Sequence, residues 1–202
     1  MNTSITLKAL LDTLLLSVLL LSNVQASQFS NHNTSSLDYL ISTLQDPLVQ
    51  NLLKVPTAVL VGPQSVGKGL LISQVVGYRV SYSDPSMGTR CPVRYMLRNA
   101  SEEKFETFKV GGNPVERHQI ADKVVEHMKY LDLSVGFSVD TLDVEIFEVN
   151  SLPVNIIDLP GFPDVNQNNY GLVKHLIQQT IAAQQADAIL IGIMHAGHPE
   201  VT

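Results

Sequence analysis

Residues 55–68 read VPTAVLVGPQSVGK, an apolar run rich in β-branched side chains that passes directly into a glycine-bounded loop and a lysine. A continuous apolar run of this kind is typical of a strand that is buried on both faces of a parallel sheet. Gly62 and Gly67 bracket the loop and Lys68 follows, which is a G-x-x-x-x-G-K spacing. That spacing lets consecutive backbone N–H groups curl around a phosphate. The stretch therefore predicts a phosphate-binding loop between a strand and a helix of an α/β domain.

Lys68 and the loop amides are the groups expected to hold the phosphate chain of a nucleotide. The lysine would meet the β- and γ-phosphates, and glycine keeps side chains out of the ligand's path. The alternative is a glycine-rich turn with an exposed lysine. Because a strand is expected before the loop and a helix after it, we interpret the loop as a phosphate site. The nucleotide-binding residues predicted here are Gly62, Gln64, Ser65, Val66, Gly67, Lys68 and Gly69.

Gly69 departs from the motif at the position that follows the lysine. The motif ends there in Ser or Thr, whose hydroxyl ligates the Mg²⁺ that bridges the terminal phosphates. Glycine removes that ligand. Nucleotide binding can survive through the loop amides and Lys68, whereas hydrolysis depends on the metal to neutralise charge that develops on the phosphoryl group.

A second motif, Asp158-Leu159-Pro160-Gly161, follows another apolar run at residues 154–157. Asp158 would supply a carboxylate for the metal through water, and Gly161 would offer its backbone N–H to a γ-phosphate. By itself such a tetrapeptide is a common turn at the end of a strand. Because it follows a phosphate loop and a buried strand, we interpret it as a D-x-x-G nucleotide switch.

Thr89 lies in the polar segment of residues 77–91, between the loop helix and the next expected strand. Nucleotide switches place a threonine on Mg²⁺ in such a segment, so Thr89 joins Asp158 as a candidate metal ligand. Judged without the neighbouring motifs, Asp84 and Arg90 are interpreted as solvated loop residues.

The composition excludes several other classes of protein. The 202 residues are 45% hydrophobic and 16% charged, which fits one folded domain of ordinary globular composition. A formal charge of −6 provides no general basic surface, so nucleic acid is not an expected partner. A single cysteine, Cys91, excludes an intrachain disulfide framework.

Hydrophobic periodicity predicts the remaining elements of the domain. Helices are expected over residues 37–52, from Lys68 onward, over 114–131 with entry through Pro114, and over 172–184. Strands are expected over 93–97, 105–110, 142–149, 154–157 and 186–194, and 142–149 alternates as an antiparallel strand would. Gly111 and Gly112 form the expected hairpin turn. This order predicts a three-layer P-loop NTPase fold with a mostly parallel central sheet.

The first 26 residues are interpreted as a signal peptide. Lys8 precedes an apolar run at residues 14–21, and small residues around Ala26 suit a signal peptidase. The run is shorter than the ~20 residues of a membrane-spanning helix, which favours a cleaved signal over an anchor. Asp12 and the single basic residue leave open a start without a targeting role. Residues 27–36 are rich in Ser and Asn and are expected to form a linker.

Three motifs together resemble the G1, G2 and G3 motifs of the dynamin superfamily of large GTPases, in sequence and in order. They are Gly62 to Lys68, Gly88-Thr89-Arg90-Cys91-Pro92, and Asp158 to Gly161. Gln64-Ser65 in the loop and the Thr-Arg-x-Pro pattern of residues 89–92 are more specific to that family than a bare phosphate loop. The resemblance covers residues 37–202 and implies a dynamin-type GTPase domain that uses GTP and Mg²⁺.

The resemblance also implies individual roles. Thr89 would ligate Mg²⁺ and help to position the attacking water, and Gln64 would orient that water. Ser65 would support a monovalent cation beside the phosphates, while Lys68 would hold the β- and γ-phosphates. Asp158 would keep its switch role toward the metal. Members of the family hydrolyse GTP to GDP when their GTPase domains associate, and use the cycle to remodel or divide membranes through a helical stalk.

Two departures limit this transfer. Gly69 replaces the metal-binding Ser, and Thr202 comes before the T-K-x-D guanine-reading motif, so a domain that is incomplete at its C-terminus is expected. The leading hypothesis is a GTP-hydrolysing domain of a membrane-remodelling protein. A pseudo-GTPase that binds nucleotide as a structural or assembly cue is the first alternative. A secreted protein of unrelated role is the second.

The sequence supports two hypotheses for the location of the protein in the cell. The family resemblance implies association with the cytoplasmic face of a membrane, through regions beyond this stretch. The leader instead points to the secretory pathway, where Asn33-Thr34-Ser35 and Asn99-Ala100-Ser101 would be glycosylation acceptors.

Overall fold

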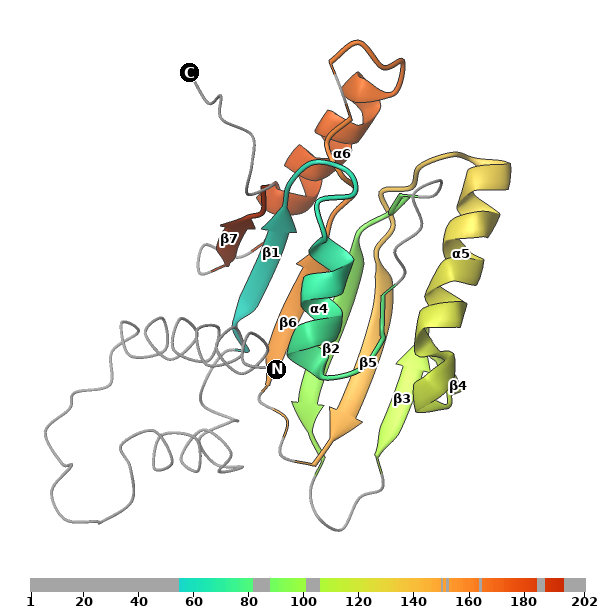
Figure 1. The fold of residues 1–202 in the computed structure, drawn as a ribbon, viewed down its shortest axis with the longest axis vertical. Coiled ribbons are helices and arrows are strands. Elements are labelled where there is room, and N and C mark those ends of the chain that lie inside the picture. The colour runs from blue at the N-terminus through green and yellow to red at the C-terminus, as the bar shows by residue number, and fades with distance from the viewer. Residues whose placement is uncertain are drawn as a thin grey trace, which may run out of the picture. The chain divides into compact units, whose positions relative to one another are not determined.

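The computed structural model describes residues 55–81, 88–100, 106–149, 151, 153–163, 165–184 and 188–194. Contacts within the chain divide it after Pro56, and every described helix and strand belongs to the unit that begins at Thr57 (Figure 1). The expected signal peptide, the linker and the helix at residues 37–52 lie outside the described residues.

Seven strands, three α-helices and one 3-10 helix make up the described fold. The chain runs through β1 (Thr57–Val61), α4 (Lys68–Val76), β2 (Val93–Asn99), β3 (Thr107–Val110), β4 (Asn113–Val115), the 3-10 helix η1 (Arg117–Gln119), α5 (Ile120–Ser134), β5 (Leu142–Glu148), β6 (Val154–Asp158), α6 (Tyr170–Ala182) and β7 (Ile189–Gly192).

The strands form one mixed sheet in the order β4-β3-β5-β2-β6-β1-β7. β1 runs parallel to both of its neighbours, β6 and β7, and β2 runs parallel to β5. The pairs β2–β6, β3–β5 and β3–β4 are antiparallel. The α/β class is confirmed, and the sheet is mixed, with three parallel and three antiparallel pairs among the described strands, where a mostly parallel sheet was expected. The parallel strands around β1 bring their carboxyl ends to one edge of the sheet.

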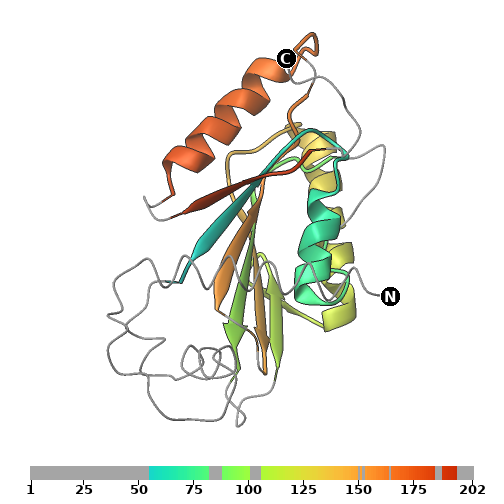
Figure 2. The same cartoon turned by 60° about the vertical axis from the view of Figure 1, so that its left-hand side comes forward.

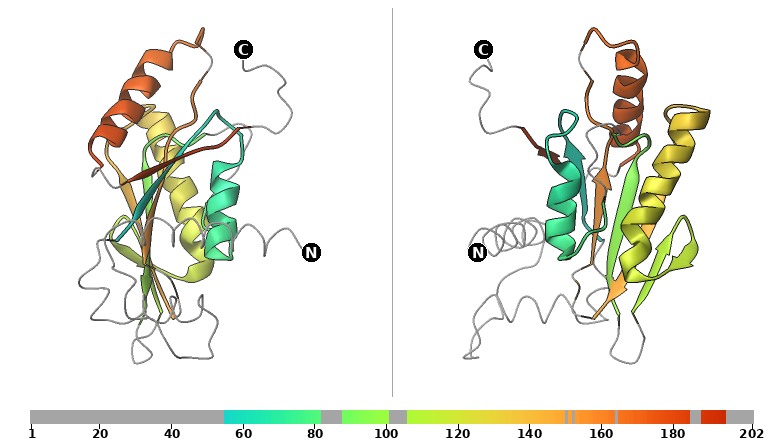
Figure 3. Two further views of the ribbon diagram at one scale, coloured as in Figure 1. Left: turned by 90° about the vertical axis from the view of Figure 1, so that its left-hand side faces the viewer. Right: turned by 45° about the vertical axis from the view of Figure 1, so that its right-hand side comes forward.

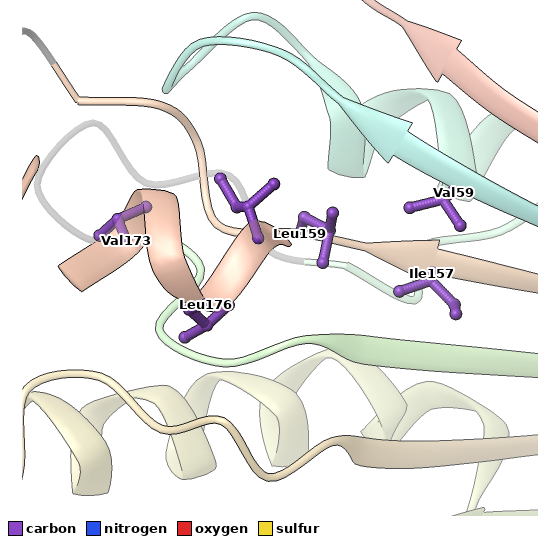
Figure 4. Close-up of a cluster of buried hydrophobic side chains, with 6 residues drawn as sticks. Val59, Ile157, Leu159, Val173 and Leu176 are labelled. Atoms are coloured by element: carbon purple, nitrogen blue, oxygen red, sulfur yellow. The ribbon is translucent and has the colours of Figure 1, made fainter. Parts of the chain in front are cut away.

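Helices cover both faces of the sheet, which gives the three layers expected from the sequence. α6 lies against one face, and α4 and α5 lie against the other (Figures 2 and 3). Under α6, Val59 of β1 and Ile157 of β6 pack with residues of the helix and of the segment before it. The complete cluster, drawn in Figure 4, is Val59, Ile157, Leu159, Val173, Leu176 and Ile177, all at most 2% exposed.

The face of the sheet that α4 and α5 cover is lined mainly by side chains of β2, β5 and β6. Tyr95 and Val144 are fully buried there, and Ile72 of α4 packs down with 0% exposure. Burial therefore continues across both faces at β1 and β6, as the continuous apolar runs of these two strands predict.

The structure corrects two further expectations. Pro114 does not open a helix; it lies in β4, which pairs with β3 across the positive-φ turn at Gly111 and Gly112, and α5 begins only at Ile120. The strand over residues 142–149 does alternate, but it runs parallel to β2 and antiparallel only to β3. Its alternation reflects one face packed on the core and one face half-open.

None of the helices that the structure describes is both long and apolar enough to cross a membrane.

Candidate nucleotide site

The loop between β1 and α4 has the backbone that the motif predicts. β1 ends at Val61 and α4 begins at Lys68, so the expected strand, loop and helix follow one another. Gly67 has φ 95°, in the left-handed region that glycine adopts freely. Ser65 has φ 60°, and among the described residues it is the one non-glycine with positive φ. Strain of this type is typical of ligand-binding loops.

Gly62 is held where a side chain would not fit. The N–H of Ile193, just after β7, donates to the carbonyl oxygen of Val61 over 2.8 Å. A Cβ at position 62 would overlap the carbonyl oxygen of Ile193. The first glycine of the loop is therefore required by the close approach of the chain leaving β7, in addition to any role toward a phosphate.

Lys68 turns back beneath the loop. Its Nζ donates to the carbonyl oxygens of Gly62 (3.2 Å) and Pro63 (3.0 Å), and the residue is 7% exposed. Burial lowers the pKa of the ammonium, and the charge of Asp158 opposes that shift. A buried cation at the start of a helix, inside a loop of backbone amides, is a suitable receptor for phosphate oxygens.

Asp158 ends β6 as a buried carboxylate, 3% exposed. Burial raises its pKa to about 6, against the opposing charge of Lys68 and a hydrogen bond from Thr89. The Thr89 hydroxyl donates to Oδ2 over 3.1 Å, whereas Oδ1 is buried without a hydrogen-bond partner. A buried unpaired carboxylate oxygen is costly unless a cation or a donor reaches it.

The antiparallel strand β2 explains how Thr89 reaches this carboxylate. Val93, where β2 begins, pairs with Asp158, where β6 ends. The segment that precedes Val93 therefore arrives at the carboxyl end of β6, although Thr89 and Asp158 are 69 positions apart.

Gln64 is the residue at which the three motifs meet. A Cβ at Gly88 would lie 3.2 Å from Nε2 of its side chain, and a Cβ at Gly161 would overlap its backbone. Phe162, the residue after Gly161, also contacts the loop, because its N–H donates to the Gly62 carbonyl oxygen over 3.2 Å. Glycine at 88 and 161 thus allows both later motifs to approach the loop.

The oxygen atoms at this edge fit a magnesium ion. Thr89 and Asp158 offer a hydroxyl and a buried carboxylate oxygen, which are hard ligands of the type that Mg²⁺ prefers. No group of three or more His, Cys, Asp or Glu residues in the described part of the chain could hold a metal by itself. Mg²⁺ is commonly bound by one or two protein oxygens plus phosphate and water, so this donor set is sufficient. Gly69, in the first turn of α4, adds no side-chain oxygen.

Arg90 is not the solvated loop residue that the sequence suggested. Its side chain is 21% exposed, and its guanidinium makes a 2.6 Å ion pair with Asp132 and lies 4.8 Å from the centre of the Phe137 ring. Sequence reasoning missed Asp132 and Phe137, because neither belongs to a recognisable motif. Asp84 lies outside the described residues.

The structure thus brings Gln64, Lys68, Thr89, Asp158 and Gly161 to one edge of the sheet. Comparison with known families adds an independent finding: the model of the dynamin family matches residues 58–200, well over half of the chain. No curated protein gives a significant match. The match spans the loop and both later motifs, and the chain therefore belongs to the dynamin family and carries a dynamin-type GTPase domain.

Proposed function

We propose that this domain binds GTP at the loop of residues 62–68 and hydrolyses it to GDP and phosphate with the aid of Mg²⁺. The observation that carries the proposal is the 3.1 Å contact between the Thr89 hydroxyl and the Asp158 carboxylate, beside the buried Lys68. A structural turn has no need to bury a lysine and a carboxylate together at the edge where a phosphate loop ends.

Each residue contributes a distinct task. Lys68 and the loop amides bind the β- and γ-phosphates, and the Thr89 and Asp158 oxygens hold Mg²⁺, Asp158 through a water molecule. When bound, Mg²⁺ neutralises charge that develops on the transferred phosphoryl group. Gln64, whose side chain lies against Gly88, orients the attacking water. Ser65 supports a monovalent cation beside the phosphates.

Gly69 favours a second candidate, a pseudo-GTPase in which bound nucleotide acts as a structural or assembly cue. A helix residue without a side-chain oxygen stands where the motif has a metal ligand, so Thr89 and Asp158 alone would provide the protein's ligands to the metal. Binding and turnover are then separable properties of this site.

In the cell, we place the domain in a protein that remodels or divides membranes, with the GTPase domains associating during the cycle. We assign the site to the cytoplasmic face, where GTP is plentiful. The leader supports the alternative, a compartment of the secretory pathway.

Replacing Lys68 with Met should weaken the binding of fluorescent GTP roughly 10- to 100-fold, because one charge-assisted contact to phosphate is lost while the apolar stem is kept. Fluorescence anisotropy measures the Kd. Lys123→Met is the control, since Lys123 is exposed on α5 and pairs only with Glu126 among the contacts described for it. Equal affinities in the two variants would contradict the assignment of Lys68. Failure of the natural chain to bind at micromolar concentration would instead favour a protein of unrelated role.

Gly69→Ser should accelerate single-turnover hydrolysis of GTP roughly tenfold or more, equivalent to about 1.4 kcal/mol in the barrier, by restoring a metal ligand. Gly69→Ala is the matched control, because it removes the helical glycine without adding an oxygen. A natural chain without turnover that Ser activates would support the pseudo-GTPase. Equal rates for the natural chain and both variants would remove the argument from Gly69.

In the nucleotide-free protein, the stability of Asp158→Asn relative to the natural chain should increase as the pH rises. The folded-state pKa of the Asp158 carboxyl, about 6, lies above its ordinary value of 3.8, so the native state keeps the proton longer than the unfolded chain and loses stability as the pH rises between these values. Between pH 4.5 and 7.5 the difference in unfolding free energy should grow by about 1–3 kcal/mol. Urea titrations measure it, and Asp140→Asn controls for the change in net charge at an exposed residue. Parallel pH profiles would refute the burial cost.

Deleting residues 2–26 should leave the cellular distribution of a tagged protein unchanged if the site faces the cytoplasm. The full-length protein should then show no mobility shift on treatment with a glycosidase, because Asn33 and Asn99 would never meet the glycosylation machinery. Imaging and gel mobility check both. A shift that disappears on deletion would establish the secretory alternative.

A further inference from the structure

The segment that carries Thr89 has no regular secondary structure of its own in residues 88–90. Its position is set by what its neighbours contact. The backbone of Arg90 is held on both sides, since its N–H donates to Met128 Sδ over 3.2 Å and its carbonyl oxygen accepts from the Ser138 N–H over 3.0 Å. Met128 is part of α5, and Ser138 follows that helix.

The side chain of Arg90 adds a second attachment to the same region. The ion pair to Asp132 measures 2.6 Å, and Phe137 offers the face of its ring at 4.8 Å. A planar guanidinium can form an ion pair through its edge while stacking on a ring with its face, which an ammonium group cannot. The two contacts therefore fix the orientation of the side chain as well as its location.

Both partners of the guanidinium are themselves anchored. Asp132 lies in the last turn of α5, whose carboxyl end reaches the same edge of the sheet as the end of β1 (Figure 1). Phe137 packs against the cluster beneath α6 that includes Leu159, the residue after Asp158. Arg90 thus connects the Thr89 segment to a helix and to the core next to the carboxylate that Thr89 meets.

We propose that Arg90 is a positioning residue for Thr89. Held between Asp132 and Phe137, it keeps the Thr89 hydroxyl on the Asp158 carboxylate and so presents both oxygens to Mg²⁺. The part that concerns the metal rests on the proposed function, whereas the placement of Thr89 is a property of the protein without nucleotide. An arginine that only stabilises the fold would not change how much the Thr89 hydroxyl contributes to stability.

A double-mutant cycle in the nucleotide-free protein tests the placement. Thr89→Val removes the hydroxyl and keeps the shape, and Arg90→Lys keeps the charge and removes the stacked, planar group. If Arg90 positions Thr89, the destabilisation by Thr89→Val should fall at least severalfold in the Arg90→Lys background, because the contact is already lost there. Chemical unfolding measures all four proteins.

Arg117 provides the matched control. It also combines ion pairs, to Glu106 and Glu148, with ring contacts to Tyr78 and Phe108, but it precedes the opposite end of α5. The intervening helix is about 20 Å long. Arg117→Lys should therefore be additive with Thr89→Val.

The second measurement is the gain in affinity for a non-hydrolysable GTP analogue on replacing EDTA with Mg²⁺. Arg90→Lys and Asp132→Asn should each reduce that gain at least tenfold, with affinities in EDTA unchanged within twofold. Arg117→Lys should keep the full gain.

The outcomes separate the two proposals. Additive effects of Thr89→Val and Arg90→Lys would overturn the positioning role, whether or not nucleotide binds. Coupling in the cycle without any binding of the analogue would support the role of Arg90 and refute the proposed function. Equal losses of the Mg²⁺-dependent gain in Arg90→Lys and Arg117→Lys would show that Arg90 acts only on general stability.

Discussion

The buried carboxylate of Asp158 is the constraint on which the site depends. It stands at the end of β6 in register with Leu60 of β1, and it shares its surroundings with the buried ammonium of Lys68. Removing these charges from water costs free energy that an opposite charge, a donor or a metal must offset. Because β1 and β6 are parallel neighbours, the loop lysine and the carboxylate arrive at the same edge. The electrostatics of the site therefore follow from the register of two strands.

The core beneath α6 maintains that register. Val59 and Ile157 come from the paired strands, and Leu159 extends the same cluster one residue beyond Asp158. The chain then returns to the loop through Gly161 and Phe162. The motif from Asp158 to Gly161 thus lies between a packed core and the phosphate loop. A displacement of Gly161 would therefore disturb the packing of both.

Local patterns predicted the parts of the fold that are locally determined. Apolar runs and glycine spacing within a few residues predict the loop, β1, β6 and α4. The expectation failed at Pro114, because a proline suits the first turn of a helix and an edge strand equally well, and the preceding turn at Gly111 and Gly112 decided in favour of β4. Alternation in β5 reported which face is buried and carried no information on the direction of its neighbours.

Contacts at the site depend on tertiary pairings that no local pattern encodes. The antiparallel register of β2 with β6 places Val93 opposite Asp158, and this brings Thr89 to the carboxylate. Had β2 run parallel to β6, its amino end, and Thr89 with it, would lie at the far edge of the sheet, one strand length from the phosphate loop. The contact between the Arg90 N–H and Met128 also depends on tertiary structure, because the two residues are 38 positions apart. A sheet of purely parallel strands could present the loop and Asp158 together, but the reversed strand β2 is what adds the threonine to them.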